Sequence, residues 1–202
     1  MTKQDARITR TKGLIYDAFI KLMGESGFEG ITINDLTQRA GLNRGTFYLH
    51  YKDKFDLLEE IENSLLAGLM EIYQTFSPLT LLNHPSFDEP HPTILRIFTY
   101  FSEHADYFNV LLSPIGDPGF ASRIKKLMID QIGKRIALDL PGEHNTIIPI
   151  DLLLAYVTSA NLGVIQYWLE NGQIYSPNYM ALLMTRIGKL SPIQMTGLRQ
   201  TI

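Results

Sequence analysis

One stretch in the first quarter of the chain constrains the fold most, because it encodes the start and end of two short helices. Thr32 is a suitable N-cap for the first helix, and Asp35 stands at the third helical position, as in a capping box. Gly41 then supplies a residue that freely adopts the left-handed conformation in which helices commonly end. Asn43 is a suitable N-cap for a second helix, expected to run to about Tyr51. Two short helices joined by so brief a turn predict a helix-turn-helix unit.

Helices are also expected on both sides of this unit. Before it, apolar side chains over residues 10–26 recur at spacings of three and four, which is the pattern of a helix with one buried face. After it, Asp53 can cap a long helix that we expect to continue to roughly Phe76. Phe47 and Tyr51 are expected to anchor one side of the second short helix, which leaves its other side facing solvent.

The remainder of the chain repeats helical periodicity, which proline and glycine interrupt. We expect helices at about 93–103, 104–112, 118–138, 149–170 and 177–189. Four prolines in the segment SPLTLLNHPSFDEPHP predict a loop or a broken helix end. Strand patterns are weak throughout. The expected fold is therefore all-α with about nine helices, in which an N-terminal three-helix unit over residues 1–55 joins a larger helical domain over residues 56–202.

Composition restricts the class of protein. Hydrophobic residues make up 45% of the chain and charged residues 19%, which is typical of a globular protein. The polar N-terminus does not resemble a secretory signal, and no apolar run approaches the roughly 20 residues of a membrane-spanning helix, so we expect no membrane partner. Cysteine is absent, which excludes disulfides and thiolate metal sites and fits a cytoplasmic protein.

Charge is distributed unevenly along the chain. Residues 1–54 carry nine Lys and Arg against six Asp and Glu, whereas residues 55–202 carry nine against fifteen. A basic head on an acidic body suggests that the head alone meets a polyanion. Ordinary fluctuation in so short a segment is the alternative explanation.

The stretch ITINDLTQRAGLNRGTFYLHYKDKFDLL closely resembles the DNA-binding domain of the TetR family of bacterial transcriptional regulators. The residues that carry the resemblance are Gly41, Leu42, Asn43, Arg44, Gly45, Thr46, Phe47, Tyr48, Leu49, His50, Tyr51 and Lys54. The later segment GVIQYWLENGQIYSPNYM is similar to an ending found in one subgroup of that family. The resemblance implies a homodimeric repressor of a palindromic double-stranded DNA operator, released by a small-molecule effector. Residues 1–55 would then be the DNA-binding domain and residues 56–202 the ligand-sensing and dimerisation domain.

A set of polar residues and one glycine are the candidates for contacts with DNA. They are Thr32, Asn43, Arg44, Gly45, Thr46, Tyr48, His50 and Lys54. Asn43, Arg44 and Thr46 would lie in the first turn of the recognition helix, where base edges come within reach. Arg44 can pair with a guanine, and its alternatives are a phosphate contact or a solvated surface position. Gly45 would let the helix backbone approach the groove closely.

The other candidates suit contacts with the DNA backbone. Thr32 presents a hydroxyl and backbone N–H groups at a helix N-terminus, which suits a phosphate, and simple N-capping is the alternative that can hold at the same time. By resemblance, Tyr48 reaches a phosphate or a thymine methyl group. The resemblance likewise makes His50 and Lys54 phosphate ligands.

Two further sets of candidates lie in the larger domain. A small-molecule pocket is expected to use Tyr73, Glu103, His104 and Phe108, because such sites combine aromatic walls with a few polar groups. The dimer interface, by resemblance a four-helix bundle of the C-terminal helices, is expected to use Leu152, Tyr156, Ser159, Ala160, Gly163, Ile165 and Tyr167. These residues mix small and large side chains, as close helix packing needs, and an ordinary core is the alternative.

Enzymatic functions find little support in the sequence. His84 and His91 lie near Asp88 and Glu89, but a surface loop explains these residues better than a metal site. No phosphate-binding loop, dinucleotide-binding glycine set or nucleophile elbow occurs, so we expect no enzyme, cofactor or metal.

A TetR-like adaptor or coactivator that acts through protein contacts is the alternative function. The intact set of DNA-contact candidates argues against it, because a head that no longer binds DNA has no need to keep them. Activation rather than repression also stays open, since its sign depends on where the operator lies relative to the promoter.

Overall fold

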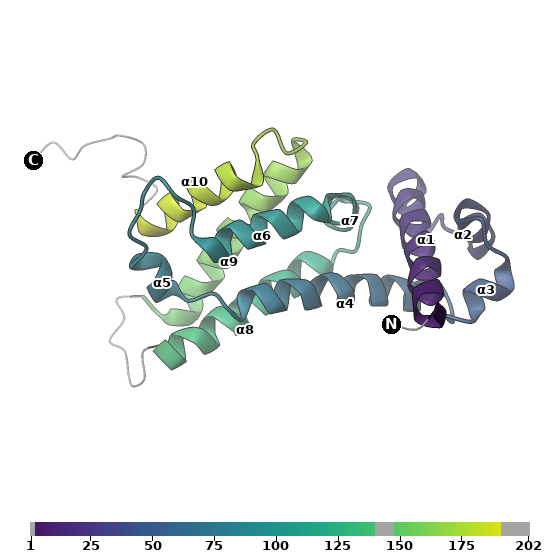
Figure 1. Cartoon of the computed structure of the whole chain (residues 1–202), viewed down its shortest axis with the longest axis horizontal. Helices are drawn as coiled ribbons and strands as arrows, with labels where there is room; N and C mark the ends of the chain where they lie inside the picture. The colour runs from purple at the N-terminus through teal and green to yellow at the C-terminus, as the bar shows by residue number, and fades with distance from the viewer. Residues whose placement is uncertain (1–2, 140–147, 191–202) are drawn as a thin grey trace, which may run out of the picture. The chain divides into compact units, whose positions relative to one another are not determined.

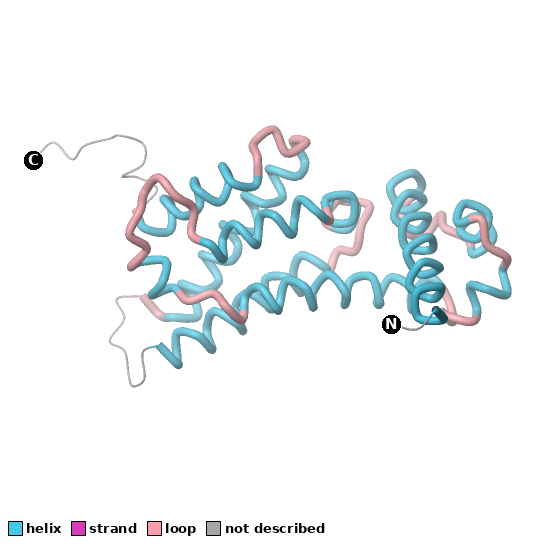
Figure 2. Tube along the Cα trace, viewed as in Figure 1, coloured by secondary structure: helices cyan, strands magenta, loops and turns pink. Residues whose placement is uncertain are grey.

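The computed structural model describes residues 3–139 and 148–190, and the fold within these ranges is all-α. Figures 1 and 2 show helices joined by loops, without a strand in the described part of the chain. The helices are α1 (Lys3–Ser26), α2 (Ile33–Ala40), α3 (Arg44–Tyr48), α4 (Lys54–Tyr73), α5 (Pro78–Leu82), α6 (Pro92–Glu103), α7 (Ala105–Leu111), α8 (Phe120–Asp139), α9 (Ile150–Glu170) and α10 (Pro177–Lys189). The expected fold class is therefore confirmed.

Contacts between residues divide the chain into two compact units, and the division falls inside α4. The first unit holds the described residues up to Leu66 together with Asp106–Phe120. The second unit holds Ala67–Ala105 and the described residues from Ala121 onward. The functional boundary between residues 55 and 56 stays a prediction, because compactness alone does not say which residues bind DNA.

The segment between α4 and α6 contains a helix where its prolines predict a loop. Ser77 caps α5, since its side chain accepts a hydrogen bond from Thr80 N at 3.4 Å, and Pro78 lies in the first turn. Proline there costs no hydrogen bond, because the first N–H groups of a helix have no acceptor within it. The described residues thus form ten helices rather than about nine.

Two helix boundaries in the first unit also differ from expectation. α1 begins at Lys3 rather than near residue 10, and its residues 5–10 are all exposed and lack the apolar spacing of a buried face. α3 ends at Tyr48 rather than near Tyr51. The backbone N–H groups of His50 and Tyr51 still donate to Phe47 O, at 2.9 and 3.0 Å, so a tight turn replaces the expected last helical turn.

The core of the first unit lies where α1, α2, α3 and the start of α4 meet. The side chains buried there to 1% exposure or less are Ile15, Phe19, Met23, Leu36, Phe47, Leu57 and Ile61. Burying each such side chain contributes roughly 1.5–3 kcal/mol. This core fixes α3 against its neighbours, which positions the surface described below.

The second unit is built around α6, which packs against α9 and α10. Phe98 and Trp168 meet edge to face with ring centroids 5.3 Å apart, and Trp168 Nε1 donates to Tyr175 O at 2.8 Å. Buried Thr185 on α10 accepts a hydrogen bond from His91 N at 2.8 Å, which ties α10 to the start of α6.

Among the described helices, α9 is long and apolar enough to cross a membrane by length and composition, contrary to the expectation from the sequence. The buried face of α9 accounts for part of this hydropathy, since Leu154, Leu162 and Trp168 are each at most 8% exposed. The helix carries a second, exposed apolar face, whose residues are described with the candidate interfaces below.

Candidate nucleic-acid interface

The two short helices α2 and α3 have the caps that the sequence predicts. The Thr32 hydroxyl accepts from Asp35 N at 3.2 Å and donates to the Asp35 carboxylate at 2.6 Å. Gly41 ends α2 in the left-handed region with φ of 66°. Asn43 Oδ1 accepts from Thr46 N at 3.1 Å and thereby starts α3. These contacts confirm the helix-turn-helix reading of the sequence.

α3 has one buried side and one exposed side, as expected. Phe47 is fully buried and Tyr51, just beyond the helix, is 2% exposed, so both anchor α3 to the core. Arg44 is exposed, Tyr48 is 47% exposed and Leu49 is 81% exposed. The exposed side is therefore rich in groups that can hydrogen-bond or contact a thymine methyl.

Arg44 and Tyr48 hold each other on this exposed side. An Nη atom of Arg44 donates to the Tyr48 hydroxyl at 3.1 Å, and the guanidinium lies 5.5 Å from the centroid of the Tyr48 ring. Tyr48 in turn packs edge to face on buried Phe47, with centroids 5.5 Å apart. The core thus orients Tyr48, and Tyr48 orients Arg44.

Packing within the chain also favours glycine at position 45, in addition to the expected close approach to DNA. A Cβ added at Gly45 would lie 3.1 Å from Asn43 Oδ1, the atom that caps α3. A side chain there would therefore crowd the cap. Close approach of the backbone to DNA stays a prediction for this residue.

Lys54 is engaged inside the first unit, while its expected contact with a phosphate stays a prediction. Its Nζ donates to the carbonyl oxygens of Phe28, Glu29 and Ile31 at 3.0, 3.2 and 3.3 Å, and its side chain is only 17% exposed. An ammonium has three N–H bonds, so these carbonyls match its donors in number. The structure therefore gives Lys54 the role of a clamp on the turn between α1 and α2, and a phosphate contact would require it to release these bonds.

Thr32 and His50, the other two candidates for a phosphate contact, differ in whether their side chains are already hydrogen-bonded. The Thr32 hydroxyl is already bonded to Asp35, so the capping alternative holds for it. His50 is half-buried, with its ring 6.2 Å from that of Tyr51, and no described contact engages its ring in a hydrogen bond. His50 is thus the better placed of the two to bind a phosphate.

A polar network behind α3 was not expected from the sequence. Glu60 Oε1 on α4 accepts hydrogen bonds from Lys12 Nζ at 2.6 Å, Tyr16 OH at 2.5 Å and Tyr51 OH at 3.4 Å. Burial raises the pKa of Tyr51 to about 12. Burial opposes ionisation of Glu60, but the hydrogen bonds from Lys12 and Tyr16 outweigh it and lower the pKa of Glu60. The network ties α1, the end of the helix-turn-helix and α4 together through one carboxylate.

No pattern in the sequence indicates this network. Lys12 and Tyr16 lie one helical turn apart, but Glu60 follows more than forty residues later, as the separations of 48 and 44 positions show.

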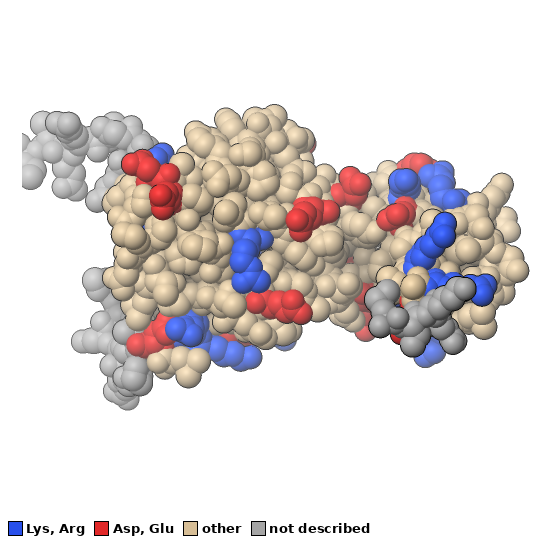
Figure 3. All heavy atoms as spheres, in the orientation of Figure 1, with Lys and Arg blue, Asp and Glu red and all other residues tan. Residues whose placement is uncertain are grey.

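On the face drawn in Figure 3, Lys and Arg side chains lie over α1, which agrees with the basic character expected for the head.

The candidate ligand residues are not gathered into one described cavity. Tyr73, Glu103 and His104 belong to the second unit, whereas Phe108 belongs to the first, where it is fully buried and stacks on Phe120 at 6.1 Å. Tyr73 is 4% exposed and Glu103 is exposed. His104 lies 4.4 Å from the Tyr100 ring, measured between centroids. Their role in ligand binding stays a prediction.

The candidate dimer residues share one exposed face of α9. All of Leu152, Tyr156, Ser159, Ala160, Gly163 and Tyr167 are exposed, and the three large ones are 59, 61 and 64% exposed. Ile165 is the exception, because it is 2% exposed and belongs to the core of its own unit. A Cβ added at Gly163 would meet no atom within 4 Å, so packing within the chain does not require a glycine there.

Two family descriptions match the chain. The one described as "Bacterial regulatory proteins, tetR family" matches residues 12–61, which include α2 and α3. The one described as "Transcriptional regulator C-terminal region" matches residues 88–189, about half of the chain. The chain belongs to the TetR family of transcriptional regulators. The matched relatives are transcriptional regulators, and the family is not one of enzymes.

Individual relatives agree with this assignment. The regulator YxbF of Bacillus subtilis (strain 168), described as HTH-type, is 25% identical over 81% of this chain, and the match covers 40% of that relative's length. A TetR transcriptional regulator from Streptococcus agalactiae 2603V is 26% identical, with a TM-score of 0.56 over 90% of this chain and 97% of its own. The regulator FadR of Bacillus subtilis, solved in complex with stearoyl-CoA, shares the fold at 16% identity, with a TM-score of 0.59 over 87% and 96% of the two chains.

Proposed function

We propose that this TetR-family regulator is a homodimeric repressor that binds a palindromic operator and is released by a small molecule. The observation that carries the proposal is the exposed side of α3, where Arg44 and Tyr48 are oriented by buried Phe47. A rigid helix that presents a paired arginine and tyrosine is suited to enter a major groove.

Within residues 1–55, we assign each DNA contact from the exposure of the side chain and from the hydrogen bonds that it already makes. Arg44 reads a base edge, with guanine as its partner, while Tyr48 contacts the adjacent phosphate or a thymine methyl. Thr46 and Asn43 lie at the start of the same helix, and Asn43 keeps its amide NH₂ for DNA because its Oδ1 caps the helix. His50 binds a phosphate.

The exposed face of α9 supports the dimer. Leu152, Tyr156 and Tyr167 expose large side chains on a helix whose opposite face is already in the core. Ser159, Ala160 and Gly163 stand between them and would let a second α9 approach closely. A two-fold dimer places two copies of α3 on two half-sites, which makes the operator an inverted repeat.

Effector binding is the third part of the proposal. A ligand held in the second unit, with Tyr73, Glu103 and His104 as the first residues to test, would favour a form whose two heads no longer match adjacent grooves. It can shift that equilibrium only by its difference in affinity for the two forms. The bound stearoyl-CoA of FadR supports a ligand site on this fold, although it does not identify the ligand of this chain.

Disruption of the α9 face tests the proposal. Tyr156→Arg places a charge in the centre of the proposed interface without touching the core, because Tyr156 is 61% exposed. Sedimentation should show a dimer for the wild type and a monomer for the variant, which should also lose specific DNA binding. Glu71→Gln, an exposed residue of α4 that changes the charge by the same amount outside this face, is the matched control. A wild-type monomer that binds a single half-site tightly would contradict the proposal.

A further inference from the structure

The loop between α5 and α6 is fastened to the last turns of α10 by hydrogen bonds. Lys189 Nζ donates to His84 O at 2.5 Å near the start of the loop. At its end, His91 N donates to Thr185 Oγ1 at 2.8 Å. His91 is also the N-cap residue of α6. The loop, α6 and α10 therefore meet at this one histidine.

The His91 side chain is buried and has a partner at each ring nitrogen. The residue is 6% exposed, and its Nδ1 accepts from Thr93 N at 3.3 Å, which caps α6. Its Nε2 lies 3.1 Å from Thr80 Oγ1. The Thr80 hydroxyl has a single proton and donates it to Ser77 O at 2.8 Å. Thr80 Oγ1 must therefore accept from Nε2, which assigns His91 the neutral tautomer with its hydrogen on Nε2.

A second proton on the His91 ring is incompatible with these bonds. The proton would have to bind at Nδ1, toward which the N–H of Thr93 already points. A protonated imidazole has no acceptor, so the cap of α6 would be lost and two N–H groups would face each other. The ring can thus take up a proton only when the loop leaves its place.

The neighbouring histidine adds to this penalty. The ring of His84 meets the ring of His91 at 5.6 Å between centroids. Burial, and then the nearby His84, hold the pKa of His91 below its ordinary value. His84 itself differs from His91 in its bonding, because its Nε2 lies 3.1 Å from Glu89 O and a carbonyl can only accept. Protonation of His84 therefore keeps that bond.

The carboxylates at this end of the second unit are already engaged elsewhere. Asp88 accepts from an Nη atom of Arg186 at 3.0 Å, and Asp139 accepts from Arg135 Nε at 2.8 Å. No described hydrogen bond or ion pair joins a carboxylate to the His91 ring. The charged or titratable groups in the loop are His84, Asp88 and Glu89, and those that contact the loop or Ser77 from α8 and α10 are Asp139, Arg186 and Lys189.

We propose that His91 is a proton-sensitive latch, in which uptake of one proton by the ring releases the cap of α6 and frees the loop from Thr185. The ring binds a proton more readily in the open state. The closed state is therefore fully stable above the ordinary histidine pKa of about 6.5 and is lost as the pH falls from there toward the lower folded value. One proton bound on opening changes the equilibrium by up to about tenfold per pH unit in this range. The inference does not depend on the proposed repressor function.

Nitrogen-15 NMR of the His91 ring in the full chain tests the closed state. At pH 7.5 the spectrum should show a hydrogen on Nε2 and none on Nδ1, and titration should give His91 a pKa below about 6.5. A hydrogen on Nδ1, or a pKa at or above that value, would overturn the proposal.

Amide exchange measures the opening. After correction for the intrinsic exchange rate, protection of the His91 and Thr93 amides should fall about five- to tenfold between pH 7.5 and 5.5. His91→Asn keeps a capping oxygen that does not titrate, so the change should be less than about twofold. His84→Asn is the matched control and should keep the dependence on pH. Protection that is independent of pH in the wild type, a dependence that persists in His91→Asn, or one that His84→Asn abolishes would each overturn the proposal.

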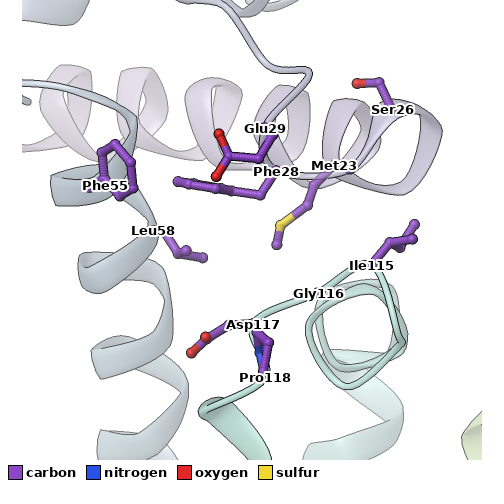
Figure 4. Close-up of a pocket in the computed structure, with 11 residues that line it drawn as sticks. Met23, Ser26, Phe28, Glu29, Phe55, Leu58, Ile115, Gly116, Asp117 and Pro118 are labelled. Carbon is purple, nitrogen blue, oxygen red and sulfur yellow. The ribbon is translucent and has the colours of Figure 1, made fainter.

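An open cavity of about 450 Å³ in the first unit provides the internal reference for this experiment. Figure 4 shows Met23, Phe28 and Leu58 pointing into the space beside the loop between α7 and α8. No histidine is among its described lining residues, and carboxylic side chains ordinarily titrate near pH 4. Protection of the Met23 and Leu58 amides should therefore stay constant from pH 7.5 to 5.5. An equal loss of protection there would show that the chain opens as a whole and would refute the latch.

Discussion

Replacing Lys54 with methionine separates two roles for the same residue. The sequence predicts a phosphate contact, whereas the structure shows three hydrogen bonds to Phe28, Glu29 and Ile31 carbonyls. A hydrogen bond to a charged group contributes about 1.5–3 kcal/mol, but water can replace the lysine at carbonyls near the surface. We therefore expect Lys54→Met to lower the free energy of unfolding by about 2–3 kcal/mol in total, which is measurable by urea denaturation.

The salt dependence of DNA binding distinguishes the two roles. A residue that neutralises one phosphate changes the slope of log affinity against log salt by about 0.9. We expect Lys54→Met to leave this slope unchanged, because its ammonium faces carbonyls rather than solvent. Lys52→Met, at an exposed neighbouring position, is the control for removing a positive charge. Unchanged stability together with a slope reduced by about one unit would refute the clamp and restore the phosphate contact.

Three further predictions concern the head and the dimer. Arg44→Ala should weaken specific DNA binding by about 1–3 kcal/mol and relax base preference at one position per half-site, measured by titrating operator variants; a uniform loss would mean a phosphate contact. Gly163→Leu should weaken dimerisation, measured by sedimentation, without lowering the stability of the monomer, because a Cβ added at this position meets no atom within 4 Å. An unchanged dimer would exclude a close approach of two helices there. Glu60→Gln should make the free energy of unfolding fall less between pH 6 and pH 3 than it does in the wild type, as measured by urea denaturation.

The sign for Glu60 follows from its lowered pKa. The folded state binds the proton less readily than the unfolded state, so the carboxylate stabilises the fold fully above the unfolded pKa of about 4.3. That contribution is lost as the pH falls through the lower folded value. Identical acid profiles for the wild type and Glu60→Gln would show that the network does not contribute to stability.

Local signals made much of the fold predictable from the sequence. Thr32, Gly41 and Asn43 act through hydrogen bonds and backbone angles within three or four residues, so their roles as caps are visible in sequence order. The exposed face of α9 is likewise set by helical spacing. Helical spacing alone did not remove Ile165 from the candidate dimer residues, although its side chain is buried in the core of its own unit.

Features that depend on distant residues were not predictable in this way. Lys54 meets carbonyls more than twenty positions earlier, and Glu60 gathers side chains from α1. The cavity in the first unit also needs the loop between α7 and α8 to return to α1. Each requires tertiary contacts that neither periodicity nor capping patterns encode.

Selection of bound sequences from a random pool of double-stranded DNA, using the full chain, tests the central claim most directly. Two copies of α3 related by a two-fold axis should recover an inverted repeat whose half-site centres lie about one helical turn, roughly 34–36 Å, apart. The same selection with Arg44→Ala should keep the spacing and lose preference at one base per half-site. Recovery of single, unpaired half-sites, or of no sequence above background, would contradict a dimeric operator-binding repressor.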